Sequence, residues 1–516
     1  MASHRGILSL TMSSRFVLRV RFLAALLILV ALVIIAKLYL LQVVHGAEYA
    51  RRAEAQIFAT HNPLLNRGAI YFTDKDGEPI VAATLREVGT TTDHQRYYPG
   101  GSLAAQALGF VAYNNDDEQK GRYGLERYYE PTLSRSGDNL YRNFFVELFG
   151  AAEAALGGQS QRGDVITTIE PSVQGELERT LLEYEATWAP QLSGGIVMDP
   201  DTGEIVAMAL SPTFDLNQFN KEDDPVIYAN PIAQNVYEMG SIMKPLTLAA
   251  GLDSGTIQES TTYNDKGCIT VDTRKICNFD GEARGVIPMQ EILSQSLNVG
   301  ASFVATQMGP EVMRDYFLNH YKFNEETGID LPGEVRGLTD NLKGTQAVEF
   351  NTASFGQGLA VTPIEMARAL ATLANGGKLV TPHLARAIKE ESGITRQLGW
   401  GEPTEVLKPQ TATAISRMLT RVVDTALADG KLKMEHYSIA AKTGTAQIAD
   451  PRGGGYYADR YLHSFFGYFP AYDAKFLVFL FAVEPQGAPF ASQTWAPPFK
   501  TLTKFLINYY NIAPDR

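Results

Sequence analysis

The sequence contains no cluster of lysine and arginine residues and no low-complexity tract. Over its 516 residues, 45 lysine and arginine residues stand against 57 aspartate and glutamate residues, and the formal net charge is −12 at pH 7. Nucleic-acid-binding proteins neutralise phosphates with grouped basic side chains, so nucleic acid is excluded as a partner. With 45% hydrophobic and 20% charged residues, the composition is that of a folded globular protein rather than a disordered or fibrous one.

Cysteine is also scarce, because Cys268 and Cys277 are the only two in the chain. A disulfide between them would suit an extracytoplasmic compartment. Spacing alone does not fix the geometry that a disulfide requires, so a bonded pair and two free thiols are both open. A closed zinc site needs about four ligands, and neither further cysteines nor clustered histidines supply them. The sequence therefore predicts no metal site and no other cofactor.

Only one hydrophobic run is long enough to cross a membrane. Residues 22–44 carry a single charge, Lys37, and at about 1.5 Å per residue they span roughly 34 Å. Arginines precede the run and acidic residues follow it, which predicts a single-pass helix with a cytoplasmic tail at 1–21 and the rest of the chain outside the cytoplasmic membrane. A cleaved signal peptide is the alternative, but its apolar core is usually shorter. Residues 476–483 are too few to span a bilayer and predict a buried strand.

The length favours two or three folded units. Residues 45–163 begin with an alanine-rich helical stalk and continue as short β-type segments broken by turns, an irregular β-rich module without a catalytic constellation. Residues 164–516 contain a strand, a helix beginning near Pro171, a hairpin, a helical middle and closing strands. This order predicts an α+β fold in which helices cover an antiparallel sheet.

Ser241 and Lys244 form the first of three motifs that could carry chemistry. They follow Gly240 in a segment of helical character. Residues i and i+3 of a helix share a face with Cβ atoms about 5 to 6 Å apart, so the lysine amine can reach the serine hydroxyl. A lysine that burial and a nearby cation keep neutral can take the proton of a serine nucleophile. The same spacing also occurs on solvated helix faces, so the pair alone does not identify a site.

The second motif is Ser296-Leu297-Asn298, at the junction of two helical stretches. Its hydroxyl can relay protons, and its amide can hold a substrate amide carbonyl. A helix cap or a turn is the simpler interpretation of this motif taken alone.

The third motif comprises four residues of a strand-like segment: Lys442, Thr443, Gly444 and Thr445. The glycine leaves room for another backbone against this edge, so an extended peptide could add there as a strand. Lys442 and the threonine hydroxyls would then receive the terminal carboxylate of that peptide. A β-bulge is the commoner reason for a glycine within a strand.

Together, in this order, the three motifs match the signature of the serine penicillin-recognising enzymes, namely Ser-x-x-Lys, Ser-x-Asn and Lys-Thr-Gly. The sequence resembles the class B penicillin-binding proteins, which are monofunctional peptidoglycan transpeptidases, over most of its length. Further segments that carry the resemblance are Arg67-Gly68 and residues 124–133, 163–174, 197–217, 355–377 and 465–471.

The resemblance implies a role for each motif residue. Ser241 is the acylated nucleophile, Lys244 is its base, and the backbone N–H groups of Ser241 and Thr445 form the oxyanion hole. The other two sides of the cleft are formed by Ser296, Asn298, Lys442, Thr443, Gly444 and Thr445. The substrates implied are peptidoglycan stem peptides ending in D-Ala-D-Ala, and β-lactams are implied as inhibitors.

The resemblance also implies how the chain is organised and where it acts. Residues 45–163 form a noncatalytic, dimerisation-like pedestal, and residues 164–516 form the transpeptidase domain. A membrane glycosyltransferase and other division proteins are the implied partners. The short pedestal and the lack of a C-terminal appendage favour a septal role, with an elongation role as the alternative.

Three positions depart from the pattern of the family. Met239 stands where proline is usual, Met243 replaces an aromatic residue, and the turn at Asp74–Gly77 lies two residues later than usual. Of the related classes, a bifunctional class A enzyme needs a glycosyltransferase domain, for which residues 45–163 are too few. A β-lactamase needs no pedestal or anchor, and a β-lactam sensor would carry several membrane spans.

Overall fold

The computed structural model describes residues 67–87, 94–113, 119–134, 162–450 and 452–516, together with scattered helical residues between 22 and 37. Residues 1–65 and 66–516 form two separate units. Among the described residues, no helix combines the length and the apolar character needed to span a bilayer. The predicted anchor at 22–44 lies mostly outside the described residues and stays a prediction.

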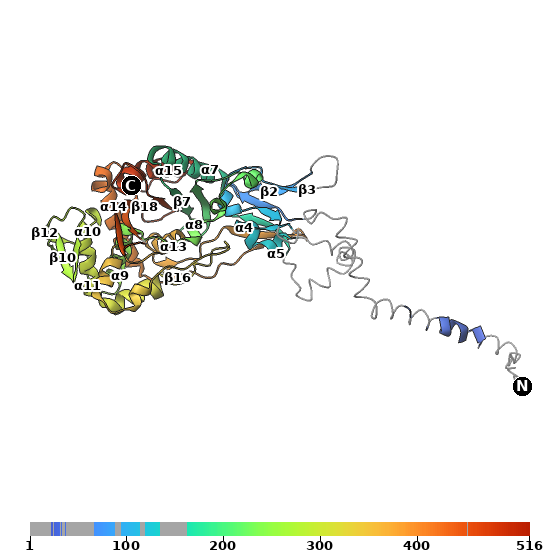
Figure 1. Cartoon of the computed structure of the whole chain (residues 1–516), viewed down its shortest axis with the longest axis horizontal. Helices are drawn as coiled ribbons and strands as arrows, with labels where there is room; N and C mark the ends of the chain where they lie inside the picture. The colour runs from blue at the N-terminus through green and yellow to red at the C-terminus, as the bar shows by residue number, and fades with distance from the viewer. Residues whose placement is uncertain are drawn as a thin grey trace, which may run out of the picture. The chain divides into compact units, whose positions relative to one another are not determined.

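A six-stranded sheet lies in the N-terminal part of the second unit (Figure 1). Its order is β15-β14-β6-β1-β2-β3, and all neighbours are antiparallel except β1 and β6. The strands are β1 (Ile70–Thr73), β2 (Pro79–Glu87), β3 (His94–Tyr97), β6 (Gly163–Thr167), β14 (Ala385–Glu390) and β15 (Thr395–Gln397). Strands from both sides of residue 163 therefore share one sheet.

The second sheet has five strands, all antiparallel, in the order β17-β18-β19-β7-β8. The strands are β7 (Leu192–Met198), β8 (Ile205–Ser211), β17 (Ala440–Asp450), β18 (Gly455–Phe469) and β19 (Phe476–Val483). Every residue of β19 is buried, which confirms the strand predicted at 476–483. Helices pack on this sheet, so the predicted α+β fold with an antiparallel sheet is confirmed.

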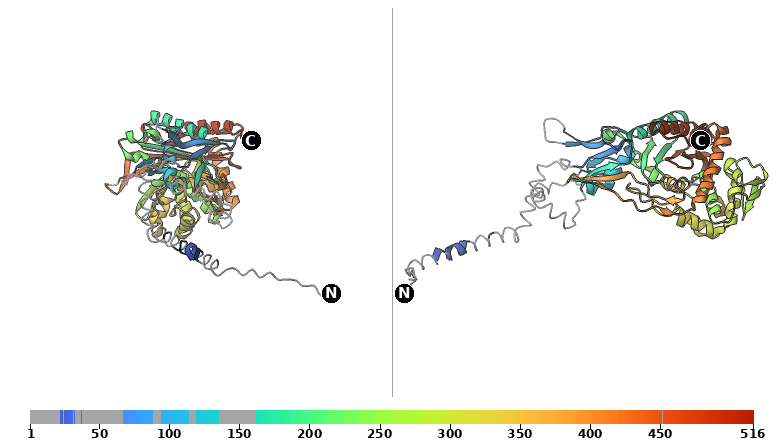
Figure 2. Two further views of the ribbon diagram at one scale, coloured as in Figure 1. Left: turned by 90° about the vertical axis from the view of Figure 1, so that its right-hand side faces the viewer. Right: turned by 180° about the vertical axis from the view of Figure 1, so that it is seen from behind.

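Helices cover both faces of the five-stranded sheet (Figures 1 and 2). On one face α7 (Pro171–Trp188) packs against α15 (Ala491–Tyr509), and the rings of Tyr184 and Trp495 stack with centroids 3.8 Å apart. The helices α13 (Pro363–Ala374) and α14 (Pro409–Thr425) also contact the sheet, and α9 (Lys244–Asp253) packs against α14 and α11 (Asn298–Arg314). Nearly every residue of α9 is buried, including its three polar residues Lys244, Thr247 and Asp253.

The remaining elements are short. The helices are α3 (Ala105–Leu108), α4 (Gly124–Tyr128), α5 (Glu130–Leu133), α8 (Pro231–Gln234), α10 (Gln290–Ser294) and α12 (Ala347–Ala353), with 3-10 or π turns η2 (Leu216–Lys221), η3 (Pro225–Tyr228), η4 (Gly240–Met243), η5 (Asp315–His320), η6 (Asp340–Lys343) and η7 (Leu427–Gly430). Paired strands are β4 (Val111–Tyr113) with β5 (Gln119–Gly121), β9 (Thr262–Asp265) with β12 (Gly285–Pro288), β10 (Cys268–Val271) with β11 (Arg274–Cys277), and β13 (Lys378–Leu379) with β16 (Thr404–Glu405).

A buried ion network organises the N-terminal part of the second unit. Glu126 is fully buried and accepts hydrogen bonds from Arg67 at 2.8 Å and from Arg96 at 2.6 Å. Burial alone would raise the pKa of Glu126, but the two guanidinium groups hold it below its ordinary value. Nearby, the Tyr129 hydroxyl donates to the buried carboxylate of Asp330 at 2.9 Å, which ties α5 to a segment 201 residues further along the chain.

Candidate active site

Ser241 lies on a tight turn that the chain builds around Gly240. The 3-10 turn η4 begins at Gly240 and runs directly into α9 at Lys244. Gly240 has φ of 65°, in the left-handed region that favours glycine, and a Cβ there would lie 2.8 Å from the carbonyl oxygen of Thr445. Its N–H donates to the carbonyl of Gly356 at 3.1 Å. Glycine is therefore required where the Ser241 turn, residues 239–243, passes β17.

The amine of Lys244 is completely buried beside Ser241. Its Nζ lies 2.9 Å from Ser241 Oγ, 2.6 Å from the carbonyl oxygen of Ser296 and 3.1 Å from Ser296 Oγ. Burial, and then the charge of Lys442, lowers the pKa of Lys244 well below its ordinary value. A neutral amine at this distance can remove the proton of a serine hydroxyl.

The Ser296 hydroxyl bridges two lysines. It lies 3.1 Å from Lys244 Nζ and 3.0 Å from Lys442 Nζ, and Lys442 also donates to the carbonyl of Thr443 at 3.0 Å. Burial lowers the pKa of Lys442 to about 7. Ser241, Lys244, Ser296 and Lys442 thus form one continuous chain of polar contacts along which a proton could move.

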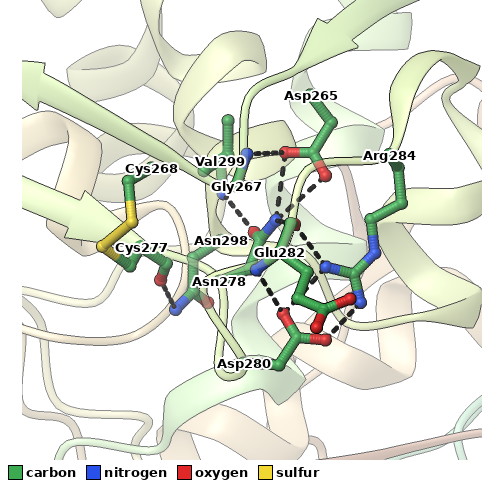
Figure 3. The surroundings of a disulfide bond; sticks show 10 residues. All are labelled: Asp265, Gly267, Cys268, Cys277, Asn278, Asp280, Glu282, Arg284, Asn298 and Val299. Carbon is green, nitrogen blue, oxygen red and sulfur yellow. Dashed lines mark hydrogen bonds and ion pairs between the residues drawn. A yellow bond between two sulfur atoms is a disulfide. The ribbon is translucent and has the colours of Figure 1, made fainter.

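Asn298 begins α11, and its side chain turns toward the β10–β11 hairpin (Figure 3). Its amide donates to the carbonyl of Cys277 at 2.9 Å. Cys277 itself forms a disulfide with Cys268, its directly opposite partner in the hairpin, with the two Cα atoms 4.1 Å apart. The sequence left this pairing open, and the structure contains the bond.

The third motif lies on β17, the edge strand of the five-stranded sheet. A Cβ on Gly444 would come within 2.5 Å of the Met239 carbonyl oxygen and would also strike the Ser464 hydroxyl. The backbone that packs against this glycine is therefore the Ser241 turn of the same chain. The Thr445 hydroxyl accepts from the N–H of Ala491 at 3.1 Å, which fixes β17 against the start of α15.

Several residues that support the site carry no motif and were not assigned a role from the sequence. The Ser464 hydroxyl donates to the Met239 carbonyl at 2.8 Å. Glu238, three residues before Ser241, accepts from the N–H of Gly358 at 3.0 Å and from the Tyr456 hydroxyl at 3.1 Å. Burial raises the pKa of Glu238. The available signal lay beside them: residues 355–377, which contain Gly358, and 465–471, which begin directly after Ser464, carry the family resemblance.

Comparison with known proteins agrees with this geometry. Residues 194–504 match the family described as the penicillin binding protein transpeptidase domain. The chain is 30% identical over 443 residues to stage V sporulation protein D of Bacillus subtilis, a match that covers 83% of this chain and 66% of that protein. The chain therefore spans about two thirds of the length of this relative. Identity to peptidoglycan D,D-transpeptidase FtsI of Buchnera aphidicola is 25% over 429 residues, which covers 82% of this chain and 71% of FtsI.

The fold is likewise shared with a solved structure, penicillin-binding protein 3 of Mycobacterium tuberculosis complexed with aztreonam. The TM-score is 0.75 at 25% sequence identity, and the match covers 87% of this chain and 97% of that chain. Three findings agree. The family match covers residues 194–504, the three motifs lie at one site, and the relatives are class B enzymes. The chain belongs to the penicillin-binding transpeptidases, among the class B penicillin-binding proteins.

Proposed function

We propose that the chain is a serine-type peptidoglycan D,D-transpeptidase that cross-links stem peptides through an acyl-enzyme on Ser241. The observation that carries this proposal is the 2.9 Å contact between Ser241 Oγ and the buried, pKa-lowered amine of Lys244. A serine hydroxyl is a weak nucleophile until an adjacent base takes its proton. The bridge through Ser296 to Lys442 offers a route by which that proton reaches the leaving group.

The reaction consists of two acyl transfers. Lys244 takes the Ser241 proton while Oγ attacks the carbonyl of the penultimate D-alanine. The C–N bond to the terminal D-alanine breaks, and the amine of that residue leaves with a proton supplied through Lys244 and Ser296. The amine of a neighbouring stem peptide then attacks the ester, so that a new amide forms and Ser241 regains its proton.

Six further groups bind the substrate in this proposal. The backbone N–H groups of Ser241 and Thr445 stabilise the oxyanion, and the close approach of Gly240 to Thr445 supports their pairing. Lys442, with the hydroxyls of Thr443 and Thr445, receives the terminal carboxylate of a peptide that adds along the edge of β17. Asn298 holds the amide carbonyl of the substrate. A β-lactam that mimics this peptide would acylate Ser241.

The setting of the enzyme follows from the same proposal. Residues 22–44 anchor the chain in the cytoplasmic membrane in a single pass, residues 45–163 act as a pedestal, and residues 164–516 catalyse outside the cytoplasm. A membrane glycosyltransferase and division proteins are the proposed partners, in septal rather than elongation synthesis. Imaging a fluorescent fusion tests the last point, because a sidewall distribution would favour the elongation role.

The activity is tested with a peptide ending in D-Ala-D-Ala and a second amine as acceptor. The wild-type chain should release D-alanine and form the cross-linked product, and Ser241→Ala should form neither. Ser254→Ala, which alters a serine at the other end of the same helix, is the matched control and should retain activity. Product formation by Ser241→Ala would contradict the proposal.

A further inference from the structure

Ser296 holds a backbone conformation that the chain must enforce. Its φ is 55°, in the left-handed region, although it is not glycine. Such a conformation is unfavourable for a residue with a Cβ and persists only where the surroundings determine it. Ser296 is also the residue whose hydroxyl bridges Lys244 and Lys442. Whatever fixes this turn therefore controls the alignment of the two lysines.

The segment from Asp265 to Arg284 supplies that constraint, through contacts to residues on both sides of Ser296. Figure 3 shows the contacts to Asn298 and Val299. After Ser296, the Asn278 side-chain oxygen accepts from the N–H of Val299 at 3.1 Å, and the Cys277 carbonyl accepts from the Asn298 amide at 2.9 Å. The N–H of Val299 belongs to the first turn of α11, where no intrahelical partner exists. Asn278 thus acts as a helix cap supplied from outside the helix.

Before Ser296, the contact comes from Arg284. Its Nε donates to the Gln295 side chain at 3.1 Å, and its remaining nitrogens bond to Asp280 and to the carbonyl of Glu282. Residues 295, 298 and 299 are therefore all tied to one loop, and Ser296 lies between the tied positions.

A buried carboxylate orients the central contact. Asp265 is fully buried, and both of its oxygens accept from Asn278 Nδ2 at 3.0 Å, while one also accepts from the N–H of Gly267 at 3.2 Å. Because the Asn278 NH2 group must face the carboxylate, its carbonyl oxygen must face Val299. Asp265 and Asn278 stand on either side of the β10–β11 hairpin, which the disulfide between Cys268 and Cys277 closes.

We propose that Asp265 and Asn278 are positioning residues of the transpeptidase. This proposal rests on the proposed function and deepens it. Neither residue belongs to the three motifs. Asp265 orients Asn278, Asn278 fixes the start of α11, and the turn at Ser296 thereby holds its hydroxyl between Lys244 and Lys442.

An exchange of the two side chains tests the proposal. Asn278→Asp places two carboxylates together and should lower the rate constant for acylation by a fluorescent penicillin at least about tenfold. The double variant Asp265→Asn/Asn278→Asp restores a donor facing a carboxylate, and the carboxylate of residue 278 can still accept from Val299. It should recover to within about threefold of wild type, since the hydrogen bonds lost in the single variant are re-formed.

The pH profile of acylation separates positioning from mere loss of stability. Displacement of the Ser296 hydroxyl changes the surroundings of both lysines, so Asn278→Asp should shift the profile and the double variant should restore it. Asp253→Asn is the matched control, because Asp253 is a buried carboxylate that accepts from Tyr316, Lys408 and Thr411 away from the three motifs. It should lower the melting temperature and leave both the rate and the profile of the folded enzyme unchanged.

Three outcomes would overturn the proposal: wild-type acylation by Asn278→Asp, failure of the folded double variant to recover, or an Asp253→Asn profile that shifts in the same way. Should Asn278→Asp not fold, Asp265→Asn replaces it, because asparagine keeps the shape of the aspartate side chain and removes its charge. An unchanged acylation rate in Asp265→Asn would also overturn the proposal. If the wild-type chain is not acylated, the proposed function fails separately. Crystal structures of the variants then decide, because an unmoved Ser296 turn contradicts positioning and a displaced turn supports it.

Discussion

Lys244 and Lys442 are two amines buried close enough to share one hydroxyl, and neither has a carboxylate partner among its hydrogen bonds in the described part of the chain. Two adjacent ammonium groups in a region that excludes water would be strongly disfavoured, so burial and mutual repulsion both favour loss of a proton. The lowered pKa of Lys244 is thus a direct consequence of packing. The same packing suits Lys244 to the role of base proposed for it and lowers the pKa of Lys442 to about 7.

The rate of acylation should therefore depend on pH with two limbs. As the pH falls, Lys244 gains a proton and can no longer accept one, so the rate decreases. As the pH rises above about 7, Lys442 loses the charge that binds a carboxylate, so the rate also decreases. The two apparent pKa values belong to the coupled pair. Stopped-flow acylation by a fluorescent penicillin measures the profile, and Lys442→Arg should remove the alkaline limb because arginine stays charged.

Gly444→Ala should reduce acylation by at least about tenfold, because a misplacement of roughly 1 Å at the reacting groups costs up to a hundredfold. The added methyl would strike the Met239 carbonyl and the Ser464 side chain, and would push β17 away from the Ser241 turn. Gly455→Ala, on the exposed start of β18 with open space around it, is the matched control. Equal acylation rates for Gly444→Ala and Gly455→Ala would show that the contact between Gly444 and the Met239 carbonyl does not affect acylation.

The catalytic candidates could be predicted from the sequence, because residues at fixed short spacing within each motif share a turn or a strand. The residues that support the site outside the motifs could not be predicted in this way. Asp265 and Asn278 act on Val299 across 34 and 21 residues, through a hairpin whose position depends on tertiary packing. Gly444 was interpreted through a bound peptide, whereas the atoms nearest to a Cβ there are the Ser464 hydroxyl and the Met239 carbonyl of the chain itself.

The β10–β11 hairpin carries the disulfide between Cys268 and Cys277. Its disulfide closes a short loop of nine residues' separation, and the hairpin contacts α11 and α12. A cross-link stabilises chiefly by restricting the unfolded chain, and this loop is short, so the contribution is modest.

Replacing both cysteines by serine should lower the free energy of unfolding by about 2 to 3 kcal/mol. Thermal unfolding of the Cys268→Ser/Cys277→Ser chain, compared with wild type under oxidising conditions, gives the measurement. A thiol assay of the unfolded wild-type chain supplies the control, because free thiols there would mean that the bond is absent. An unchanged melting temperature would contradict a stabilising role.

The antiparallel sheet and the strand at 476–483 were predictable because their signal is local: alternating or continuous apolar residues bounded by turns. The six-stranded sheet could not be predicted from local patterns. Its β14 and β15 come from more than 200 residues after β6, and no local pattern indicates which edge a late strand will pair with. Sequence reasoning placed a division at residue 163 and had no means of seeing that this sheet crosses it.

At the level of the whole molecule, the second unit is held together by buried charges as well as by its apolar core. Glu126 and its two arginines join α4 to the segment at Arg67 and to β3, and Tyr129 joins α5 to Asp330, which in turn accepts from the N–H groups of Leu384 and Ala385. These contacts connect segments distant in the sequence, so they form only when the chain is folded as a whole.

Glu126→Gln should therefore destabilise the chain by roughly 3 to 5 kcal/mol, because the buried Arg96 guanidinium would lose its carboxylate partner and Arg67 would keep only Glu130. The pKa of Glu126 is lowered in the folded state, so its stabilisation is present above the ordinary carboxylate pKa and is lost as the pH falls through the folded value. Thermal unfolding from pH 7 downward measures both effects. A variant as stable and as acid-sensitive as wild type would contradict this account.

Intact mass spectrometry of the full chain after reaction with a penicillin shows whether Ser241 is the nucleophile. A single covalent adduct should form, map to the segment containing Ser241, persist in Ser254→Ala and be absent from Ser241→Ala. No adduct on the wild-type chain, or an adduct that survives in Ser241→Ala, would contradict it.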